Sequence, residues 1–335
     1  MAQLILSPTD IVKKKTTFVF NSTLLNSQEN KIILAPMQNL TSLFFRKTFA
    51  KYFPQTVDYA VTPFISACSN TANSKSIAFD DIKKEENENS VPIVPQIIGR
   101  NTEHIVQTCK IIECMGYREV NLNMGCPKKD IVSRGRGSGL LDKPEDVRAI
   151  IEAILKNTSL LLSIKVRTGI KNDTDLEKMI PMLNSYPLKS VTIHPRRAID
   201  FYEGRADEDK FEYLAKELKH TIIYNGDIFS KEDFVRLKSR FPFVNQWMIG
   251  RGLIRNPFLA TEIKGCPITR EMLKPFVLEL KESFESSLRK RNETLVLNKM
   301  KEFSKYICQG LNISEAPFVH STSLNEITKL FENYL

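Results

Sequence analysis

The chain has 335 residues, of which 42% are hydrophobic and 26% charged, and this balance excludes a wholly disordered protein. No apolar run reaches the roughly 18 residues that a membrane-spanning helix needs, and the first residues lack the pattern of a secretory signal. We therefore expect a cytoplasmic protein, and the formal net charge of +9 favours an anionic partner.

The cysteines and histidines give no sign of a metal site. Six cysteines, at positions 68, 109, 114, 126, 266 and 308, form no CxxC pair, and none of the four histidines lies at a zinc-type spacing from them. This pattern predicts free thiols in a reducing compartment and no bound metal. The length suits one large barrel or open sheet with an appendage, and we expect a monomer.

Short apolar segments recur along the chain, and most of them are separated by amphipathic stretches with helical periodicity. Eight strands are predicted, at 31–35, 57–61, 92–98, 119–123, 160–166, 189–194, 221–225 and 246–250. Strands that alternate with helices in this way predict an α/β protein, a parallel (β/α)₈ TIM barrel.

Three regions depart from this alternation. Residues 66–76 are interpreted as a loop over the barrel mouth, and the acidic run at 80–90 as a solvated surface loop. From residue 266 onward the pattern is helical only. We therefore divide the chain into an N-terminal extension (1–30), a barrel (31–265) and a small C-terminal helical domain (266–335).

The stretch NLNMGCPKKDIVSRGRGSGLL, residues 121–141, combines a lone cysteine with basic residues and glycines. Its apolar beginning predicts a strand that Gly125 and Pro127 end, so Cys126 should lie where the strand opens into a loop. Active sites of such barrels lie at the C-terminal ends of the strands. Cys126 is therefore a candidate for chemistry.

Other predicted strands also end in polar residues or glycines, which favours a ligand site at the mouth. Lys165 and Arg167 alternate on one strand and should face the same side, where two cations suit an electron-rich ring with carbonyl oxygens. After the last two strands, Gly226, Gly250 and Gly252 can present backbone N–H groups to a phosphate, and Arg251 adds charge.

These motifs resemble one family, the flavin-dependent tRNA dihydrouridine synthases. The resemblance covers about residues 32–262, in order LAPMQNLT, PQIIG, NLNMGCP, GSGLL, IKVRTG, HPRRAIDFYEG, YNGD and MIGRG. It implies a flavin-binding TIM barrel followed by a helical RNA-binding domain. The reaction it implies is reduction of a tRNA uridine to 5,6-dihydrouridine, with NADPH reducing FMN and Cys126 protonating carbon 5 of the uracil.

The resemblance also implies roles for residues around the mouth. FMN contacts would be Pro36, Met37, Gln96, Lys165 and His194, with the phosphate end at Asn225, Gly226, Asp227, Gly250 and Arg251. The uracil would be held by Asn123, Arg167 and Tyr202, and the RNA backbone by Lys128, Lys129, Arg134 and Arg136. Pro63 follows Thr62 where many members of the family have a glutamate, so no catalytic carboxylate is expected there.

Alternatives remain at this point. The same chemistry on ribosomal RNA, or a flavin barrel that reduces a small enone or pyrimidine, would share the phosphate site and the cationic strand. A non-catalytic RNA-binding barrel is disfavoured because Cys126, Lys165 and His194 are all present.

Overall fold

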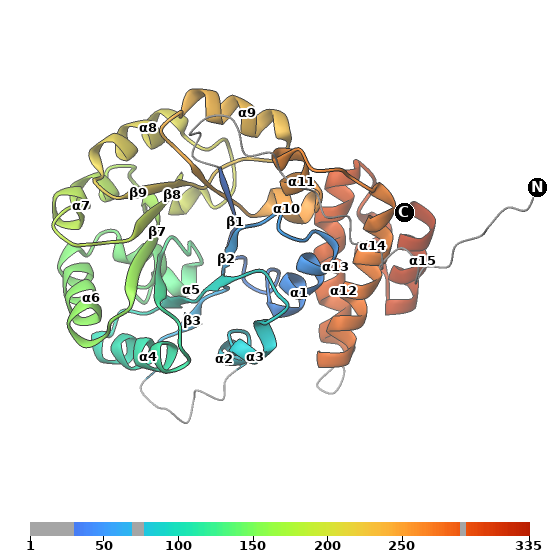
Figure 1. Cartoon of the computed structure of the whole chain (residues 1–335), viewed down its shortest axis with the longest axis horizontal. Helices are drawn as coiled ribbons and strands as arrows, with labels where there is room; N and C mark the ends of the chain where they lie inside the picture. The colour runs from blue at the N-terminus through green and yellow to red at the C-terminus, as the bar shows by residue number, and fades with distance from the viewer. Residues whose placement is uncertain (1–29, 69–76, 289–292) are drawn as a thin grey trace, which may run out of the picture.

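The computed structural model describes residues 30–68, 77–288 and 293–335 (Figure 1). The predicted N-terminal extension and most of the predicted loop at 66–76 therefore lie outside the described residues. Within them, no helix combines the length and apolarity needed to cross a bilayer.

Ten parallel strands form one sheet that curls into a barrel. Their order is β3-β5-β6-β7-β8-β9-β10-β1-β2-β4. The strands are β1 (Lys31–Leu34), β2 (Tyr59–Val61), β3 (Ile65–Ser66), β4 (Ile93–Val94), β5 (Gln96–Ile98), β6 (Glu119–Met124), β7 (Leu161–Gly169), β8 (Ser190–Arg197), β9 (Thr221–Tyr224) and β10 (Gln246–Ile249). All eight predicted strand positions are confirmed, and β3 is an additional short strand.

The barrel closes through the third predicted strand, which Pro95 divides into β4 and β5. The carbonyl of Val94 accepts a hydrogen bond from the Thr62 amide of the preceding strand (3.1 Å), and the carbonyl of Pro95 accepts one from the Asn121 amide of β6 (2.9 Å). One continuous segment thus pairs on both sides although proline lacks an N–H group. The two ends of the strand order meet there.

Helices surround the barrel and continue beyond it (Figure 1). They are α1 (Leu43–Tyr52), α2 (Ile77–Asp80), α3 (Lys84–Asn87), α4 (Thr102–Cys114), α5 (Lys129–Val132), α6 (Pro144–Asn157), α7 (Asp175–Leu183), α8 (Glu208–Glu217), α9 (Lys231–Arg240), α10 (Arg251–Arg255), α11 (Leu259–Lys264), α12 (Leu273–Leu288), α13 (Glu293–Leu311), α14 (Ala316–His320) and α15 (Leu324–Tyr334).

The run at 80–90 is largely exposed, as expected, but the prediction of a loop is wrong, because the run contains the end of α2 and all of α3. Asp81 accepts hydrogen bonds from the fully buried guanidinium of Arg46 (2.9 Å) and from the Leu43 amide (2.6 Å). The Asn87 side chain also accepts from Arg46 (3.1 Å). A buried cation requires such partners, and they order a segment whose composition alone suggested a loop.

Helices α12–α15 lie to one side of the barrel, and α12 and α13 pack against α1 (Figure 1). Phe45 of α1 stacks on Phe303 of α13 with ring centroids 5.6 Å apart and meets Phe276 of α12 edge-on at 6.1 Å. The apolar core continues from the barrel helices into these C-terminal helices. The helical region predicted from residue 266 onward is present, while its independence as a domain stays a prediction.

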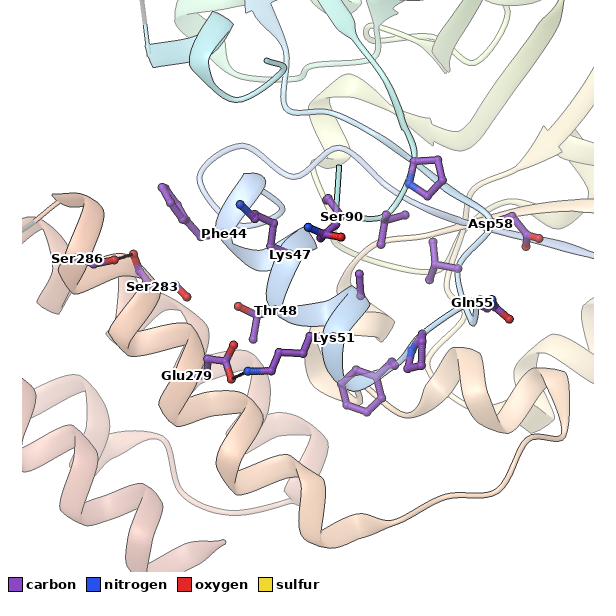
Figure 2. A pocket seen from close by; sticks show the side chains of 17 residues that line it. Phe44, Lys47, Thr48, Lys51, Gln55, Asp58, Ser90, Glu279, Ser283 and Ser286 are labelled. Atoms are coloured by element: carbon purple, nitrogen blue, oxygen red, sulfur yellow. Dashed lines mark hydrogen bonds and ion pairs between the residues drawn. The ribbon is translucent and has the colours of Figure 1, made fainter. Parts of the chain in front are cut away.

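A broad groove of about 1050 Å³ runs between α1 and α12 (Figure 2). Lys51 of α1 pairs across it with Glu279 of α12, which also accepts a hydrogen bond from Tyr52. Asp58 and Pro92, which line the groove, precede β2 and β4. The groove therefore lies near the N-terminal ends of the strands, away from the end where barrels of this kind place their chemistry.

Candidate active site

The alternation of side chains along each strand decides which residues point into the barrel. Ile33, Ala35, Val61, Ile223 and Met248 form a small apolar cluster separate from the main core. Their neighbours Ile32, Leu34, Trp247 and Ile249 belong instead to the core shared with the outer helices. Two residues further along the chain from Ala35, Ile223 and Met248, just past the ends of β1, β9 and β10, the same alternation places Met37, Asn225 and Gly250 on the inner side of the barrel.

A cavity of about 370 Å³ opens at the C-terminal ends of the strands, within the range of small-molecule sites. It brings together most of the predicted site residues, namely Pro36, Met37, Asn123, Cys126, Lys128, Lys165, Arg167, His194, Tyr202, Asn225, Gly226, Gly250 and Arg251. Gln96, Asp227, Lys129, Arg134 and Arg136 do not line it. The last three belong to α5 and the loop after it, beside the mouth.

Cys126 is held at the mouth by a chain of buried amides. The Asn123 side-chain oxygen accepts hydrogen bonds from the backbone amides of Cys126 (2.5 Å) and Gly125 (3.1 Å). Gln96 lies below, where its oxygen accepts from Asn123 and its nitrogen donates to Asn121, each at 2.8 Å. Because both ends of its amide are used, Gln96 is placed to orient Asn123. Burial raises the pKa of the Cys126 thiol, which favours its protonated form.

The glycines after Cys126 have a packing role. Gly137 has a φ of +60°, and a Cβ there would lie 2.8 Å from the Cys126 carbonyl oxygen. That carbonyl accepts hydrogen bonds from both the amide and the hydroxyl of Ser138, each at 3.0 Å. The loop can fold this tightly over Cys126 only because residue 137 has no side chain.

Gly137→Ala should therefore disturb Cys126 more than the rest of the fold. We expect a loss of about 1–3 kcal/mol in the free energy of unfolding from strain and overpacking, and faster alkylation of Cys126. Thermal unfolding and mass-spectrometric labelling of the thiol measure the two effects. Gly204→Ala is a matched control, since Gly204 also has positive φ (+65°) but no atom near its Cβ position. Equal behaviour of the two variants would contradict this account.

Lys165 and Arg167 both reach the mouth, as their alternation predicted, but their surroundings differ. The Arg167 guanidinium donates to the carbonyls of Gly125 (2.9 Å), Arg197 (2.8 Å) and Phe201 (2.6 Å), so it ties the Cys126 loop to the loop after β8. The Lys165 ammonium has no hydrogen bond or ion pair with any residue the structure describes. Burial, followed by the charge of Arg167, lowers the pKa of Lys165 to about 7.

His194 is a neutral imidazole in one tautomer. Its Nε2 lies 3.0 Å from a guanidinium nitrogen of Arg196, and because arginine only donates, Nε2 must accept. The ring proton is therefore on Nδ1. Burial, followed by the charges of Arg167 and Lys165, holds the pKa of His194 well below its usual range. His194 can thus offer one hydrogen-bond donor to a ligand without carrying charge.

The loops after β9 and β10 approach each other closely. A Cβ on Gly252 would lie 2.1 Å from the Ile228 carbonyl oxygen, and one on Gly250 would lie 3.2 Å from Met37 Sδ at the cavity wall. The first amides of α10 have no partner within the helix and follow Gly250 directly. Asp227 accepts from Arg251 (2.8 Å) and also pairs with Arg196, so it holds these cations in place.

Tyr202 lies across the opening between two cations. Its ring centroid is 4.9 Å from the Arg251 guanidinium carbon, 5.4 Å from that of Arg167 and 6.2 Å from the His194 ring. The side chain is half exposed. An aromatic face fixed in this way can pack against a planar ligand that enters the mouth.

The cavity wall also contains residues to which sequence analysis assigned no role, among them Glu302 and Tyr306, which come from α13. They are four residues apart and so share one face of the helix. Lys299, one turn earlier, donates to the Asn39 carbonyl beside Met37 (2.6 Å), and Gly310 packs so closely that its Cβ would lie 1.9 Å from the Arg255 carbonyl oxygen. Helical periodicity alone could not indicate which face meets the barrel.

Two curated relatives of this chain are tRNA-dihydrouridine synthases by name. A probable tRNA-dihydrouridine synthase of Rhizobium leguminosarum bv. phaseoli is 28% identical over 240 residues, covering 71% of this chain and 73% of that protein. The tRNA-dihydrouridine synthase B of Pasteurella multocida is 27% identical over 234 residues, covering 69% and 68%.

Solved structures support the fold. A 2-naphthoyl-CoA reductase complex has a TM-score of 0.55 at 10% identity, covering 71% of this chain and 50% of that one. An old yellow enzyme homologue from Zymomonas mobilis has a TM-score of 0.51 at 10% identity, covering 74% and 92%. At such identities the likeness concerns the barrel fold alone.

The family comparison extends over nearly all of the described chain. The sequence model of the family described as "Dihydrouridine synthase (Dus)" matches residues 33–330, which include both the barrel strands that build the cavity and the α13 residues that complete its wall. The chain therefore belongs to the dihydrouridine synthase family.

Proposed function

We propose that this protein reduces a specific uridine of tRNA to 5,6-dihydrouridine, with FMN as its prosthetic group and NADPH as reductant. The family match and the curated relatives support the reaction. The observation that carries the assignment is the position of Cys126, a thiol fixed at the mouth of a cavity that also contains a lysine with no partner among the described residues; burial raises the pKa of this thiol. We further propose that the protein acts as a monomer in the cytoplasm.

The residues of the cavity fit a flavin mononucleotide. Lys165 has no carboxylate partner among the described residues and donates hydrogen bonds as an amine or as an ammonium group, and the Nδ1–H of His194 has no acceptor among those residues; both suit the oxygens of an electron-rich ring. Asn225, Gly226, Gly250 and Arg251 would hold the phosphate end, and Asp227 would position Arg251. When bound, FMN reduced by NADPH supplies a hydride from N5 to carbon 6 of the uracil.

The protein residues then complete the reduction. Cys126 donates its proton to carbon 5, so the two hydrogens add across the double bond and the thiolate regains a proton from water at the half-exposed mouth. Negative charge that develops on the uracil oxygens is stabilised by the donors of Asn123 and Arg167. Tyr202 packs on the base, and Lys128, Lys129, Arg134 and Arg136 bind the surrounding RNA backbone.

The base must leave its stack to reach this cavity, and α13 forms part of the wall that would receive it. Tyr306→Ala should raise the KM for tRNA about tenfold, because aromatic stacking on a base contributes about 1–3 kcal/mol. Tyr306→Phe keeps the ring and should stay near wild type. Flavin content and the rate of reduction by NADPH should be unchanged in both variants. Unaltered tRNA kinetics in the alanine variant would remove Tyr306 from the substrate site.

The proposed reaction is tested by incubating the purified protein with FMN, NADPH and an unmodified tRNA transcript. Nucleoside digestion and mass spectrometry should find dihydrouridine in the tRNA. Parallel reactions contain ribosomal RNA fragments or free uridine. Product in either of these and none in tRNA would replace the proposed substrate, and no product in any reaction would contradict the enzymatic function.

A further inference from the structure

A second cleft of about 1040 Å³ adjoins the mouth on the far side of Arg251. It lies between the loop after β8, the segment after β9 and the short helix α10, and it shares Tyr202, Phe229 and Arg251 with the main cavity. Six arginines and five carboxylates line it. The cleft is therefore rich in charge of both signs, with one cation in excess.

The carboxylates of this cleft all have partners within the protein. Asp227 binds Arg196 and Arg251, and Glu208 binds both Arg236 and Arg240. Asp209 pairs with Arg240 as well. Asp207 accepts the Lys210 amide at the start of α8 (2.9 Å), and Asp233 accepts the amides of Phe229 (2.9 Å) and Ser230 (3.0 Å) at the start of α9.

Two of the arginines lack such partners. Within the part of the chain that the structure describes, the guanidinium groups of Arg205 and Arg255 make no ion pair and no hydrogen bond. The Nε of Arg255 is buried without an acceptor, while its guanidinium carbon lies 4.4 Å from the Phe229 ring centroid. A buried N–H group without an acceptor is costly, so Arg255 is suited to an anion that enters the cleft.

The surrounding charges decide what kind of anion fits. An extended RNA backbone would bring successive phosphates past Asp207, which caps α8, and past the ion pairs of Glu208 and Asp209, where none of the described residues offers an unpaired cation. A single phosphate needs only the two arginines of the cleft that have no partner among the described residues, and each of them would offer it a forked donor. The cleft thus suits a small molecule with a localised dianion better than a polyanion.

We propose that Arg205 and Arg255 bind the 2′-phosphate of the nicotinamide dinucleotide that reduces the flavin, and this inference rests on the proposed function. Because the cleft meets the main cavity at Tyr202 and Arg251, the adenosine end would lie in the cleft while the nicotinamide end reaches the mouth. NADPH carries this phosphate and NADH does not. The two arginines would therefore make the enzyme prefer NADPH.

The test uses flavin-loaded Arg205→Ala, Arg255→Ala and double variants. Anaerobic bleaching of the flavin is measured against NADPH and NADH concentration, and NADP⁺ affinity is measured by calorimetry. Each single variant should weaken NADPH and NADP⁺ binding about tenfold or more, as expected for a charge-assisted hydrogen bond, and leave NADH unchanged. Arg236→Ala is the matched control, since it removes a cleft arginine that is already paired with Glu208.

Three results would overturn the proposal: no change with either nucleotide, an equal loss with both, or a loss confined to tRNA binding. Flavin content and reoxidation of dithionite-reduced enzyme by tRNA are recorded for every variant. If the wild-type protein itself bound no flavin, or if tRNA did not reoxidise it after reduction, the proposed function would be contradicted instead. Arg205→Lys and Arg255→Lys should recover part of the NADPH affinity, because they restore charge without the forked geometry.

Discussion

Replacing Cys126 by alanine is expected to leave FMN bound and reducible by NADPH while slowing uridine reduction by about 10²–10⁴-fold. The thiol lies at the mouth on a fixed backbone, and burial raises its pKa. Its removal takes away the proposed proton donor without touching Lys165 or the phosphate end. Single-turnover reoxidation of the reduced enzyme by tRNA, followed at the flavin absorption band, measures the effect.

The pH dependence of that step provides a second measure. A general acid must be protonated, so wild-type reoxidation should slow as the pH rises through the raised pKa of Cys126. Cys114→Ala is the matched control, because Cys114 is exposed at the end of α4. If tRNA reoxidised the reduced Cys126→Ala variant at the wild-type rate, the proton would come from another group.

Replacing Lys165 by methionine is expected to weaken FMN binding about 10- to 100-fold, since a hydrogen bond to a charged group contributes about 1.5–3 kcal/mol. Methionine keeps much of the length of the side chain but removes an ammonium group that has no partner among the described residues. Equilibrium titration of the apoprotein with FMN gives the dissociation constant. Lys178→Met, on the exposed face of α7, should bind FMN normally.

Lys165 also links flavin binding to protons. Its pKa is lowered from 10.5 to about 7 in the folded chain, so between these values the unfolded chain binds a proton that the folded chain does not. The contribution of this group to the stability of the flavin-free protein therefore rises with pH across that window.

A flavin oxygen beside the Lys165 ammonium would raise the pKa of Lys165 again. FMN binding near pH 8.5 should therefore take up a proton in the wild-type protein but not in Lys165→Met. Calorimetry in buffers of different ionisation enthalpy tests this, and equal uptake would exclude Lys165 as the linked group.

Much of the barrel could be predicted from sequence because local physics dictates it. Buried parallel strands appear as short apolar runs, and period-two alternation places Lys165 and Arg167 on one side of β7. The position of Cys126 followed from Gly125 and Pro127, which end a strand at the side of the barrel where sites form. These features depend on a few neighbouring residues, so the sequence carries them directly.

The remainder depends on long-range packing. The acidic run at 80–90 is ordered by Arg46, more than thirty residues earlier in the chain, so its composition suggested a loop. Glu302 and Tyr306 enter the cavity because Lys299 and Gly310 fix α13 against distant parts of the barrel. Likewise, the hydrogen bonds of the Gln96 amide to Asn121 and Asn123 were not foreseen, and its contact with FMN stays a prediction. Contacts of this kind become visible only when the chain is folded.

The most direct test of the whole account is the absorption spectrum of the purified, FMN-reconstituted protein during anaerobic addition of NADPH and then of unmodified tRNA. We predict flavin bands that bleach with NADPH and return only when tRNA is added, with dihydrouridine found in the recovered RNA. A protein that cannot be reconstituted with FMN, or whose reduced flavin is not reoxidised by tRNA, would contradict the account.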